Sequence, residues 1–323
     1  MPLRVRRAAA IPAPAPVTPV ATPSVPASRS PFGALRAPFA PTRRAPRAAP
    51  AKLFTGPSLP PGASIVPAHD LDAVYARIAT LADTDGVTVQ TLGSVDNQPI
   101  HAIHLPASPT AKAPLKVVVT AGLHGNEPCG QGVAFLLIDQ ILAQPELRDK
   151  IDLTVIPNIN PRGYVEGSRR TPEDVDLNRK FFEDDAPVEI ELVREYLSAR
   201  PVDLALDLHS GKSTRNGFWA LHRDSRALLT PVFERFGKRW PVLSGDTKPY
   251  KMQSPGVGVS SNKTTLKDYM KTIGARWSIT LEAPGSLGYG EQVLGQNDLV
   301  RETITEAVGR PRKRPRTLLG ALN

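Results

Sequence analysis

Short, almost wholly apolar segments alternate along this chain with segments of helical periodicity. The apolar segments include residues 115–121, 202–208 and 277–281, and helical periodicity marks residues 129–142 and 291–308. Continuous apolar strands are typical of a sheet that helices cover on both faces. The alternation therefore predicts a single three-layer α/β/α domain with a mixed, mostly parallel central sheet.

Other segments extend this pattern toward both ends of the chain. We expect further helices at residues 69–82, 188–197 and 228–236, and further strands at residues 87–92, 100–105, 153–156 and 217–221. The first two of these strands alternate in polarity and flank an Asp-Asn-Gln turn, which predicts a hairpin. Residues 241–265 show little periodicity and are expected to form a long loop, a feature that is more often functional than idle.

The N-terminal region has a composition unlike that of a folded core. Residues 1–69 contain 16 of the 34 prolines and nine basic residues, but no Asp or Glu. Those nine basic residues equal the net charge of +9, so the basic pI does not describe a nucleic-acid-binding fold. We expect a disordered Pro/Ala/Arg-rich arm over residues 1–66, a folded domain over residues 67–309 and a basic tail over residues 310–323.

Cysteine content and hydropathy bear on the compartment. The single cysteine, Cys129, allows no internal disulfide and fits a reducing environment. No stretch approaches 18 uninterrupted apolar residues, and prolines interrupt the apolar region that a Sec signal would need. We expect a cytoplasmic protein without a membrane span, while organellar targeting and export by another route stay open.

Polar residues follow two of the apolar strands directly. His124 and Glu127 come after the strand at residues 115–121, and His209 follows residues 202–208. Two histidines and one carboxylate form a ligand set that leaves zinc an open position for water. Gly122 and Gly125 allow the tight turn that such a set needs. Alone, a His-x-x-Glu pair is more often two solvated neighbours, so the prediction of one zinc ion per chain depends on the accompanying motifs.

Those motifs occur in order between residues 121 and 282. They are AGLHGNE at 121–127, NPRG at 160–163, VDLNR at 175–179, DLH at 207–209 and TLE at 280–282. Together they resemble the funnelin-type zinc carboxypeptidases, in particular the compact murein tripeptide amidase-like kind, which is related to the succinylglutamate desuccinylase/aspartoacylase branch. The resemblance implies that His124, Glu127 and His209 bind zinc.

The resemblance also implies roles for residues outside the metal set. Asn178 and Arg179 would hold the terminal carboxylate of the substrate, and an upstream arginine would polarise the scissile carbonyl. Arg169 lies nine positions before Asn178 and is our first choice for that arginine, with Arg170 as the substitute. Glu282 ends a buried strand and suits a general base, since a carboxylate beside activated water can take its proton.

Further positions are less well defined by the motifs. Counted back without gaps from Glu282, Lys267 falls at the position that forms the base of the side-chain pocket in pancreatic-type relatives. If this register holds, the resemblance implies that a cation there favours an acidic or diaminopimelate C-terminal residue; the alternative is a solvated helix lysine beside Asp268. The capping tyrosine of the family has no clear counterpart: the ungapped position is Ser260, and the nearest tyrosines are Tyr250 and Tyr269.

Three functions are compatible with these features. The first is a zinc-dependent metallocarboxypeptidase that hydrolyses the C-terminal amide bond of a peptide. The alternative is an N-acyl amino acid deacylase of the succinylglutamate desuccinylase/aspartoacylase type. That branch usually has a β-rich domain after the catalytic glutamate, whereas only 41 residues follow Glu282 here, which favours the peptidase. The second alternative is a non-catalytic protein whose basic tails bind an acidic partner; nucleic acid is not an expected partner of the folded domain. Asp207 or Asp176 could orient a metal ligand or an arginine; the equally weighted alternative for each is a turn or cap residue.

Overall fold

The computed structural model describes residues 50–211, 214–245 and 248–311. The long helices are α1 (Leu71–Ala82), α2 (Cys129–Ala143), α4 (Val188–Ser198), α5 (Arg226–Phe236) and α7 (Tyr289–Val308). The shorter ones are η1 (Pro145–Asp149), α3 (Pro161–Glu166), η2 (Leu177–Arg179) and α6 (Leu266–Thr272). Every helix of the described chain is too short or too polar to span a bilayer.

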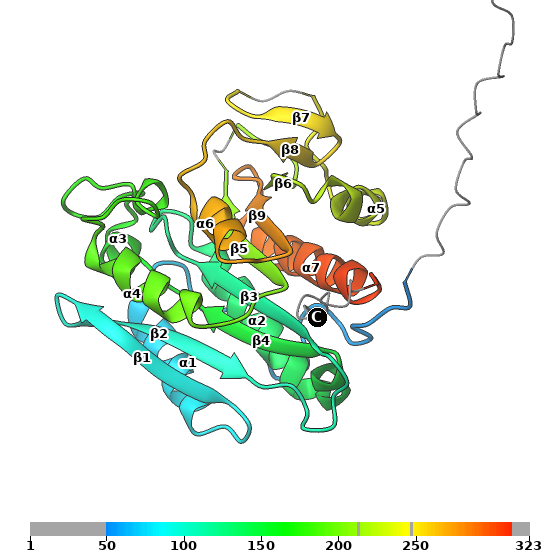
Figure 1. The fold of residues 1–323 in the computed structure, drawn as a ribbon, viewed down its shortest axis with the longest axis horizontal. Coiled ribbons are helices and arrows are strands. Elements are labelled where there is room, and N and C mark those ends of the chain that lie inside the picture. The colour runs from blue at the N-terminus through cyan, green and yellow to red at the C-terminus, as the bar shows by residue number, and fades with distance from the viewer. Residues whose placement is uncertain (1–49, 212–213, 246–247, 312–323) are drawn as a thin grey trace, which may run out of the picture. The chain divides into compact units, whose positions relative to one another are not determined.

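Nine strands form one sheet in the order β1-β2-β4-β3-β5-β9-β6-β8-β7 (Figure 1). Their bounds are β1 (Thr88–Val95), β2 (Gln98–Leu105), β3 (Leu115–Ala121), β4 (Ile151–Ile156), β5 (Leu204–Ser210), β6 (Trp219–His222), β7 (Lys251–Ser254), β8 (Val257–Val259) and β9 (Trp277–Ala283). Parallel pairing joins β4, β3, β5 and β9 in the centre and also joins β6 to β8. The other four neighbouring pairs are antiparallel, so the sheet is mixed as predicted. Among the described strands, parallel pairs equal antiparallel pairs in number and do not predominate as expected.

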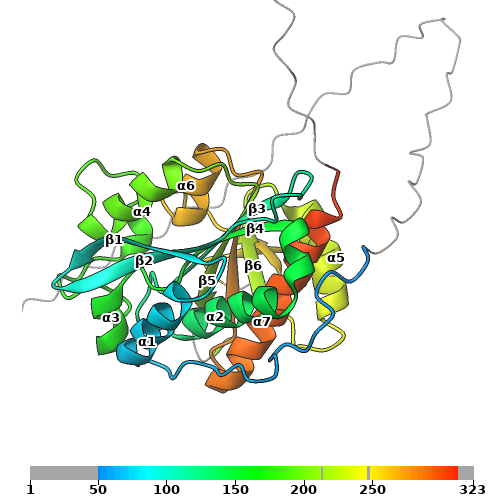
Figure 2. The ribbon, with the colours of Figure 1, turned by 90° about the horizontal axis from the view of Figure 1, so that it is seen from below.

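Helices cover the sheet on both faces (Figure 2). One layer contains α1, α2 and α7, and the other contains α4 and α6. Along β3, Val117 and Val119 pack into the core beneath α2 and α7, whereas Val118 packs into the core on the opposite face. This two-sided burial explains the continuous apolar strands, and it confirms the predicted three-layer α/β/α class.

The packed chain begins earlier than the boundary expected at residue 67. Phe54 is only 2% exposed, and Arg301 donates hydrogen bonds to the carbonyl oxygens of Phe54 at 3.4 Å and Gly56 at 2.6 Å. Gln140 donates to the Ser58 carbonyl at 2.7 Å. Side chains of α2 and α7 thus satisfy the backbone of a Pro-rich segment without regular structure, which periodicity cannot reveal. Residues 1–49 and 312–323, most of the expected arm and tail, lie outside the described residues.

The region expected as a loop at residues 241–265 contains a small hairpin. Strands β7 and β8 pair antiparallel around Gly256, which adopts a positive φ of 71°. These strands span four and three residues, too few for a polarity pattern to show.

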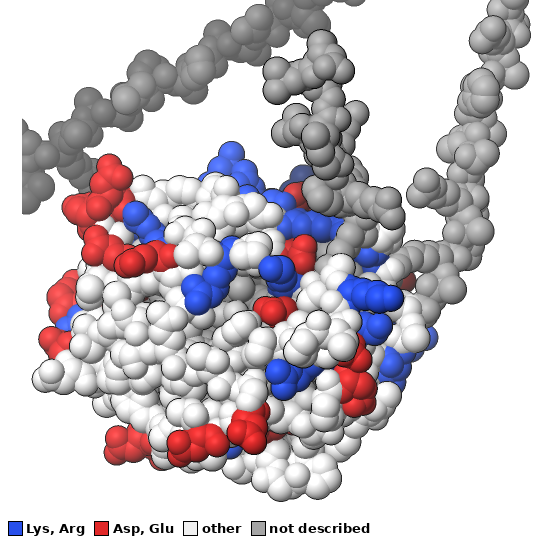
Figure 3. All heavy atoms as spheres, turned by 60° about the horizontal axis from the view of Figure 1, so that its bottom comes forward, with Lys and Arg blue, Asp and Glu red and all other residues white. Residues whose placement is uncertain are grey.

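On the surface, the face drawn in Figure 3 carries basic and acidic side chains around a wide uncharged area. Among the described residues of that face, the basic side chains lie interspersed with acidic ones.

Candidate active site

The ends of β3, β5 and β9 bring the predicted ligands and base together. His124 and Glu127 follow β3, and the parallel register of β5 with β9 pairs His209 directly with Glu282. All four side chains are buried, with exposed fractions of 2–8%. A sheet edge formed by the carboxyl ends of parallel strands is where open α/β folds place their sites.

Glycines shape the turn that carries the first two ligands. Gly122 has a φ of 69°, and a Cβ there would lie 2.5 Å from Asn158 Oδ1. A Cβ on Gly125 would lie 2.0 Å from the Gly163 carbonyl carbon. Both positions therefore need glycine, one of them for its backbone conformation as well as for space.

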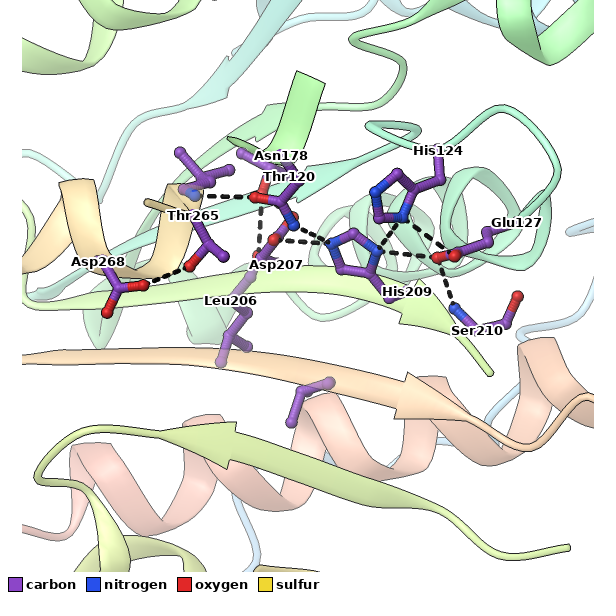
Figure 4. A network of polar contacts seen from close by, with 12 residues as sticks. Thr120, His124, Glu127, Asn178, Leu206, Asp207, His209, Ser210, Thr265 and Asp268 are labelled. Atoms are coloured by element: carbon purple, nitrogen blue, oxygen red, sulfur yellow. Dashed lines mark hydrogen bonds and ion pairs between the residues drawn. The ribbon is translucent and has the colours of Figure 1, made fainter. Parts of the chain in front are cut away.

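The three predicted ligands form a compact cluster, shown in Figure 4 as the right-hand part of a polar network. Glu127 Oε1 lies 3.0 Å from His124 Nδ1, and Glu127 Oε2 lies 2.8 Å from His209 Nδ1. The two Nδ1 atoms are 3.0 Å apart, and one donor atom from each of the three residues falls within 4.8 Å of the others. Two atoms that share a tetrahedral zinc ion lie about 3.3 Å apart, so this donor set fits zinc in chemistry and spacing.

Carboxylates hold the far side of each imidazole. Asp207 Oδ2 lies 2.8 Å from His209 Nε2, and Asp176 Oδ1 lies 3.1 Å from His124 Nε2. Thr120 donates a hydrogen bond to Asp207 at 3.0 Å and fixes it in turn. Carboxylates in these positions orient the rings so that both Nδ1 atoms face the cluster centre, as metal-binding histidines require.

The electrostatics of the cluster favour a cation at its centre. Burial acts to raise the pKa of Glu127, but His124 and His209 outweigh burial and hold that pKa well below its ordinary value. Burial acts to lower the pKa of His209, but Asp207 and Glu127 raise it well above its ordinary value. The anionic Glu127 is already in the form that binds a metal. The carboxylates that raise the pKa of His209 attract positive charge, so they would also attract a cation that displaces the proton of the ring.

Glu282 differs from the other buried carboxylate. Burial raises its pKa to about 7, with a further contribution from Glu127 that His209 and Arg215 oppose. A carboxyl group with this pKa can both accept and return a proton near neutral pH. Glu282 also lines the cavity above the cluster, where a substrate would meet it.

A cavity of about 680 Å³ contains most of the predicted site. Besides the cluster and Glu282, it is lined by Arg169, Asn178, Arg179 and Lys267. Arg170, the substitute for Arg169, lies outside the cavity wall. Its guanidinium pairs with Asp174 at 3.1 Å and does not line the cavity.

The arginine and asparagine side chains are held by neighbours in the cavity wall. Arg169 Nη1 lies 3.2 Å from Glu127 Oε1, and its Nη2 lies 3.1 Å from Asp176 Oδ2. Asn178 Oδ1 accepts a hydrogen bond from the Leu266 backbone at 2.9 Å. Arg179 donates to the Asn178 carbonyl at 2.9 Å, which leaves other donors of its guanidinium for a ligand.

Lys267 is buried rather than solvated. Its side chain is 2% exposed, and Nζ lies 2.8 Å from Asp268 Oδ1.

Of the two tyrosines considered for the capping role, Tyr250 lines the cavity, whereas Tyr269 donates its hydroxyl to the Arg194 carbonyl at 3.3 Å. Cys129 is fully buried beside α7 and donates to Gln296, as a packed residue would.

Two cations in the cavity wall were not singled out from the sequence. Arg215 and Lys248 both line the cavity, and they come from the loops before β6 and before β7. Neither belongs to a motif. The sequence did not reveal Arg215 because its contacts with the rings of Trp219 and Tyr250 form only in the folded chain.

Comparison with known proteins agrees with this geometry. The profile of the succinylglutamate desuccinylase/aspartoacylase catalytic domain matches residues 113–254, which include all three cluster residues. The resemblance to the zinc carboxypeptidase-like family is confirmed. A search of curated proteins found no match.

Solved structures described as metallopeptidases and carboxypeptidases share the fold. A proposed metallopeptidase from Shewanella amazonensis superimposes with a TM-score of 0.63 at 23% identity, covering 73% of this chain and 93% of that one. A metallo-carboxypeptidase from Burkholderia cenocepacia gives 0.61 at 18% identity, with 74% and 69% covered. Carboxypeptidase A from Helicoverpa armigera gives 0.59 at 18% identity, with 76% and 75% covered.

Proposed function

We propose that this protein is a zinc-dependent metallocarboxypeptidase that hydrolyses the amide bond of a C-terminal residue. The observation that carries the proposal is the convergence of His124, Glu127 and His209 in one wall of a cavity that Glu282 and Arg179 also line. Ligand donors, a titratable carboxylate and a carboxylate-binding cation are the groups that such a reaction needs.

Each group has a separate task. His124, Glu127 and His209 would hold one zinc ion, which supplies Lewis acidity when bound. Glu282, with a pKa of about 7, takes a proton from the attacking water and returns it to the departing amine. Arg169 lies beside the cluster and stabilises the negative charge that develops on the carbonyl oxygen.

Substrate binding falls to the remaining polar residues of the wall. Arg179, supported by Asn178, offers a planar pair of donors to the terminal carboxylate. Lys267 would bind an additional carboxylate on the C-terminal residue, such as the side chain of an acidic residue or of diaminopimelate. Because Asp268 already pairs with Lys267, we expect this preference to be modest.

A deacylase of N-acyl amino acids is the second candidate. The match of residues 113–254 to the succinylglutamate desuccinylase/aspartoacylase domain favours it. Both reactions break an amide bond whose amine side carries a carboxylate, so the same roles apply to Glu282 and Arg179. The two candidates differ in the acyl group that the cavity accepts.

Amino acid release from a substrate panel tests the proposal. The panel contains peptides ending in acidic, basic, aromatic and diaminopimelate residues, together with N-acyl amino acids. We expect release that a chelator abolishes, that zinc restores and that Glu282→Gln lowers by at least about 100-fold, the contribution of a general base. Glu234→Gln, on the exposed surface of α5, is the matched control and should retain full activity.

Metal analysis separates the possible failures. The protein should retain one zinc ion per chain after gel filtration, and His209→Ala should lose it. A wild-type protein that binds no zinc would refute the proposal. Faster release from N-acyl amino acids than from every peptide would replace the carboxypeptidase with the deacylase.

A further inference from the structure

A buried carboxamide lies behind the proposed active site, on the face of the sheet that is turned away from the cavity. Gln296 belongs to α7, is 0% exposed and does not line the cavity. Leu208 and Leu281 pack into the core beneath α2 and α7. The next residue of each strand points to the opposite face, which places His209 and Glu282 at the cavity. Gln296 therefore reaches these two strands from behind.

Both polar atoms of this carboxamide have partners. Its Nε2 donates hydrogen bonds to the carbonyl oxygens of His209 at 2.8 Å and Leu281 at 3.0 Å. Its Oε1 accepts a hydrogen bond from Cys129 Sγ at 3.4 Å. Cys129 begins α2 two residues after Glu127. Leu281 directly precedes Glu282. One side chain thus joins the end of β5, the end of β9 and the start of α2.

Close packing holds α2 near the partners of Gln296. A Cβ on Gly132 would lie 2.9 Å from Val293 Cγ2, so α2 and α7 approach each other at this position. A Cβ on Gly130 would lie 2.9 Å from the Cβ of Ala121, which ends β3. Because these contacts leave no room for a larger side chain, the distances from Gln296 to its partners cannot relax freely.

We propose that Gln296 is a positioning residue of the active site, which fixes His209 relative to Glu282 by binding the backbone of both strands through one amide group. This inference rests on the proposed function, in which His209 is a zinc ligand and Glu282 is the general base. The two N–H groups of an amide diverge at a fixed angle, so they also fix the separation of the two carbonyl oxygens that they bind. Such placement matters because a shift of about 1 Å can lower a rate about 100-fold.

Replacing Gln296 by methionine tests the proposal, since Gln296→Met keeps nearly the same size but removes the donor. In the zinc-loaded protein we expect kcat to fall by about 10-fold and KM to stay within about 3-fold. KM should change little because Asn178 and Arg179 belong to η2, outside the three segments that the carboxamide joins. Zinc affinity should fall by about 10-fold, the lower end of the range for residues that support a metal ligand.

Asn297 provides the matched control. It is the next residue of α7, it is also 0% exposed, and its Nδ2 donates to the Ser58 carbonyl at 3.0 Å, outside the site. Asn297→Leu should lower stability in denaturant unfolding without changing kcat or zinc affinity. If Gln296→Met likewise lowers only stability, the carboxamide has a packing role alone and the inference is overturned.

A second variant keeps the test decisive if Gln296→Met does not fold. Gln296→Asn retains an amide but is one methylene shorter, so it cannot bind both carbonyl oxygens. We expect it to fold and to show smaller decreases in kcat and in zinc affinity than the methionine variant. Wild-type values of both quantities in Gln296→Asn would also overturn the inference.

A spectroscopic measurement separates this inference from the proposed function. The chain has six histidines, and comparison with His209→Ala assigns the ring signal of His209 in a nitrogen–proton correlation NMR spectrum. In the metal-free protein, Gln296→Met should shift this signal and Asn297→Leu should not. An unchanged signal would overturn the inference in an active enzyme. Absence of chelator-sensitive hydrolysis in the wild type would count against the proposed function, while the His209 signal would still show whether Gln296 positions the ring.

Discussion

Asp207 connects the cluster of His124, Glu127 and His209 to the interior of the sheet. It contacts His209 Nε2 at 2.8 Å and accepts a hydrogen bond from Thr120 on the neighbouring strand. Its side chain is nearly inaccessible, with 3% exposed. Because His209 presents Nδ1 to the cluster only while Nε2 is held from behind, the orientation of one proposed ligand depends on a residue outside the ligand set.

Replacing Asp207 tests this dependence. Asp207→Asn should lower zinc affinity by about 10-fold to 100-fold, because the amide is a weaker partner for the imidazole N–H. Competition with a chromophoric chelator measures the affinity. Asp184→Asn, at an exposed position, is the control. If both variants bind zinc as the wild type does, Asp207 has no orienting role.

The turn between β3 and α2 is as important to the site as the proposed ligands that it carries. Gly122 combines a positive φ with close approach of Asn158 and Gln131. Any other residue at this position would have a strained backbone conformation, and its Cβ would also clash with the neighbouring side chains. The turn therefore has little freedom to move His124 relative to β5.

Two alanine substitutions separate these difficulties. Gly62 has a φ of 80° and no atom within 4 Å of an added Cβ, so Gly62→Ala should lower the free energy of unfolding by about 1–2 kcal/mol through backbone strain alone. Gly122→Ala should cost more than this and should also weaken zinc binding, because the turn must shift to admit the methyl group. Chemical denaturation and the chelator competition measure the two effects. Equal losses of stability with unchanged zinc affinity would show that packing around Gly122 is unimportant.

At the level of the entire domain, the segment that precedes α1 acts as part of the core. Phe54 lies within the main hydrophobic cluster, and Arg301 on α7 binds the backbone around it. Such a segment contributes apolar burial even though it contains no helix or strand.

Two truncated proteins test this contribution. A chain that starts at residue 50 retains Phe54, whereas a chain that starts at residue 67 loses it along with the Arg301 contacts. We expect the second to be less stable than the first by at least about 3 kcal/mol, the typical cost of removing a buried Phe side chain. Denaturant unfolding of both proteins gives the comparison, and equal midpoints would place residues 50–66 outside the cooperative unit.

Sequence patterns predicted those parts of the domain that local composition determines. The central strands are continuous apolar runs because helices cover them on both faces, and the proposed ligands follow the ends of those strands. Hairpin β7–β8 was missed because its short, partly exposed strands carry no clear pattern. The packing of residues 50–66 and the position of Arg215 depend on partners far away in sequence, so no local pattern could indicate them.

The pairing of His209 with Glu282 in the β5–β9 register has a further implication for how this protein can change. The spacing between a proposed metal ligand and the proposed base is set by backbone hydrogen bonds between adjacent strands, about 4.8 Å apart. Substitutions cannot adjust that spacing gradually, since a register slip moves every side chain of a strand at once. We therefore expect changes in substrate range to arise from substitutions in the loops before β6 and β7, because these loops can vary without altering the spacing between the proposed ligand and the proposed base.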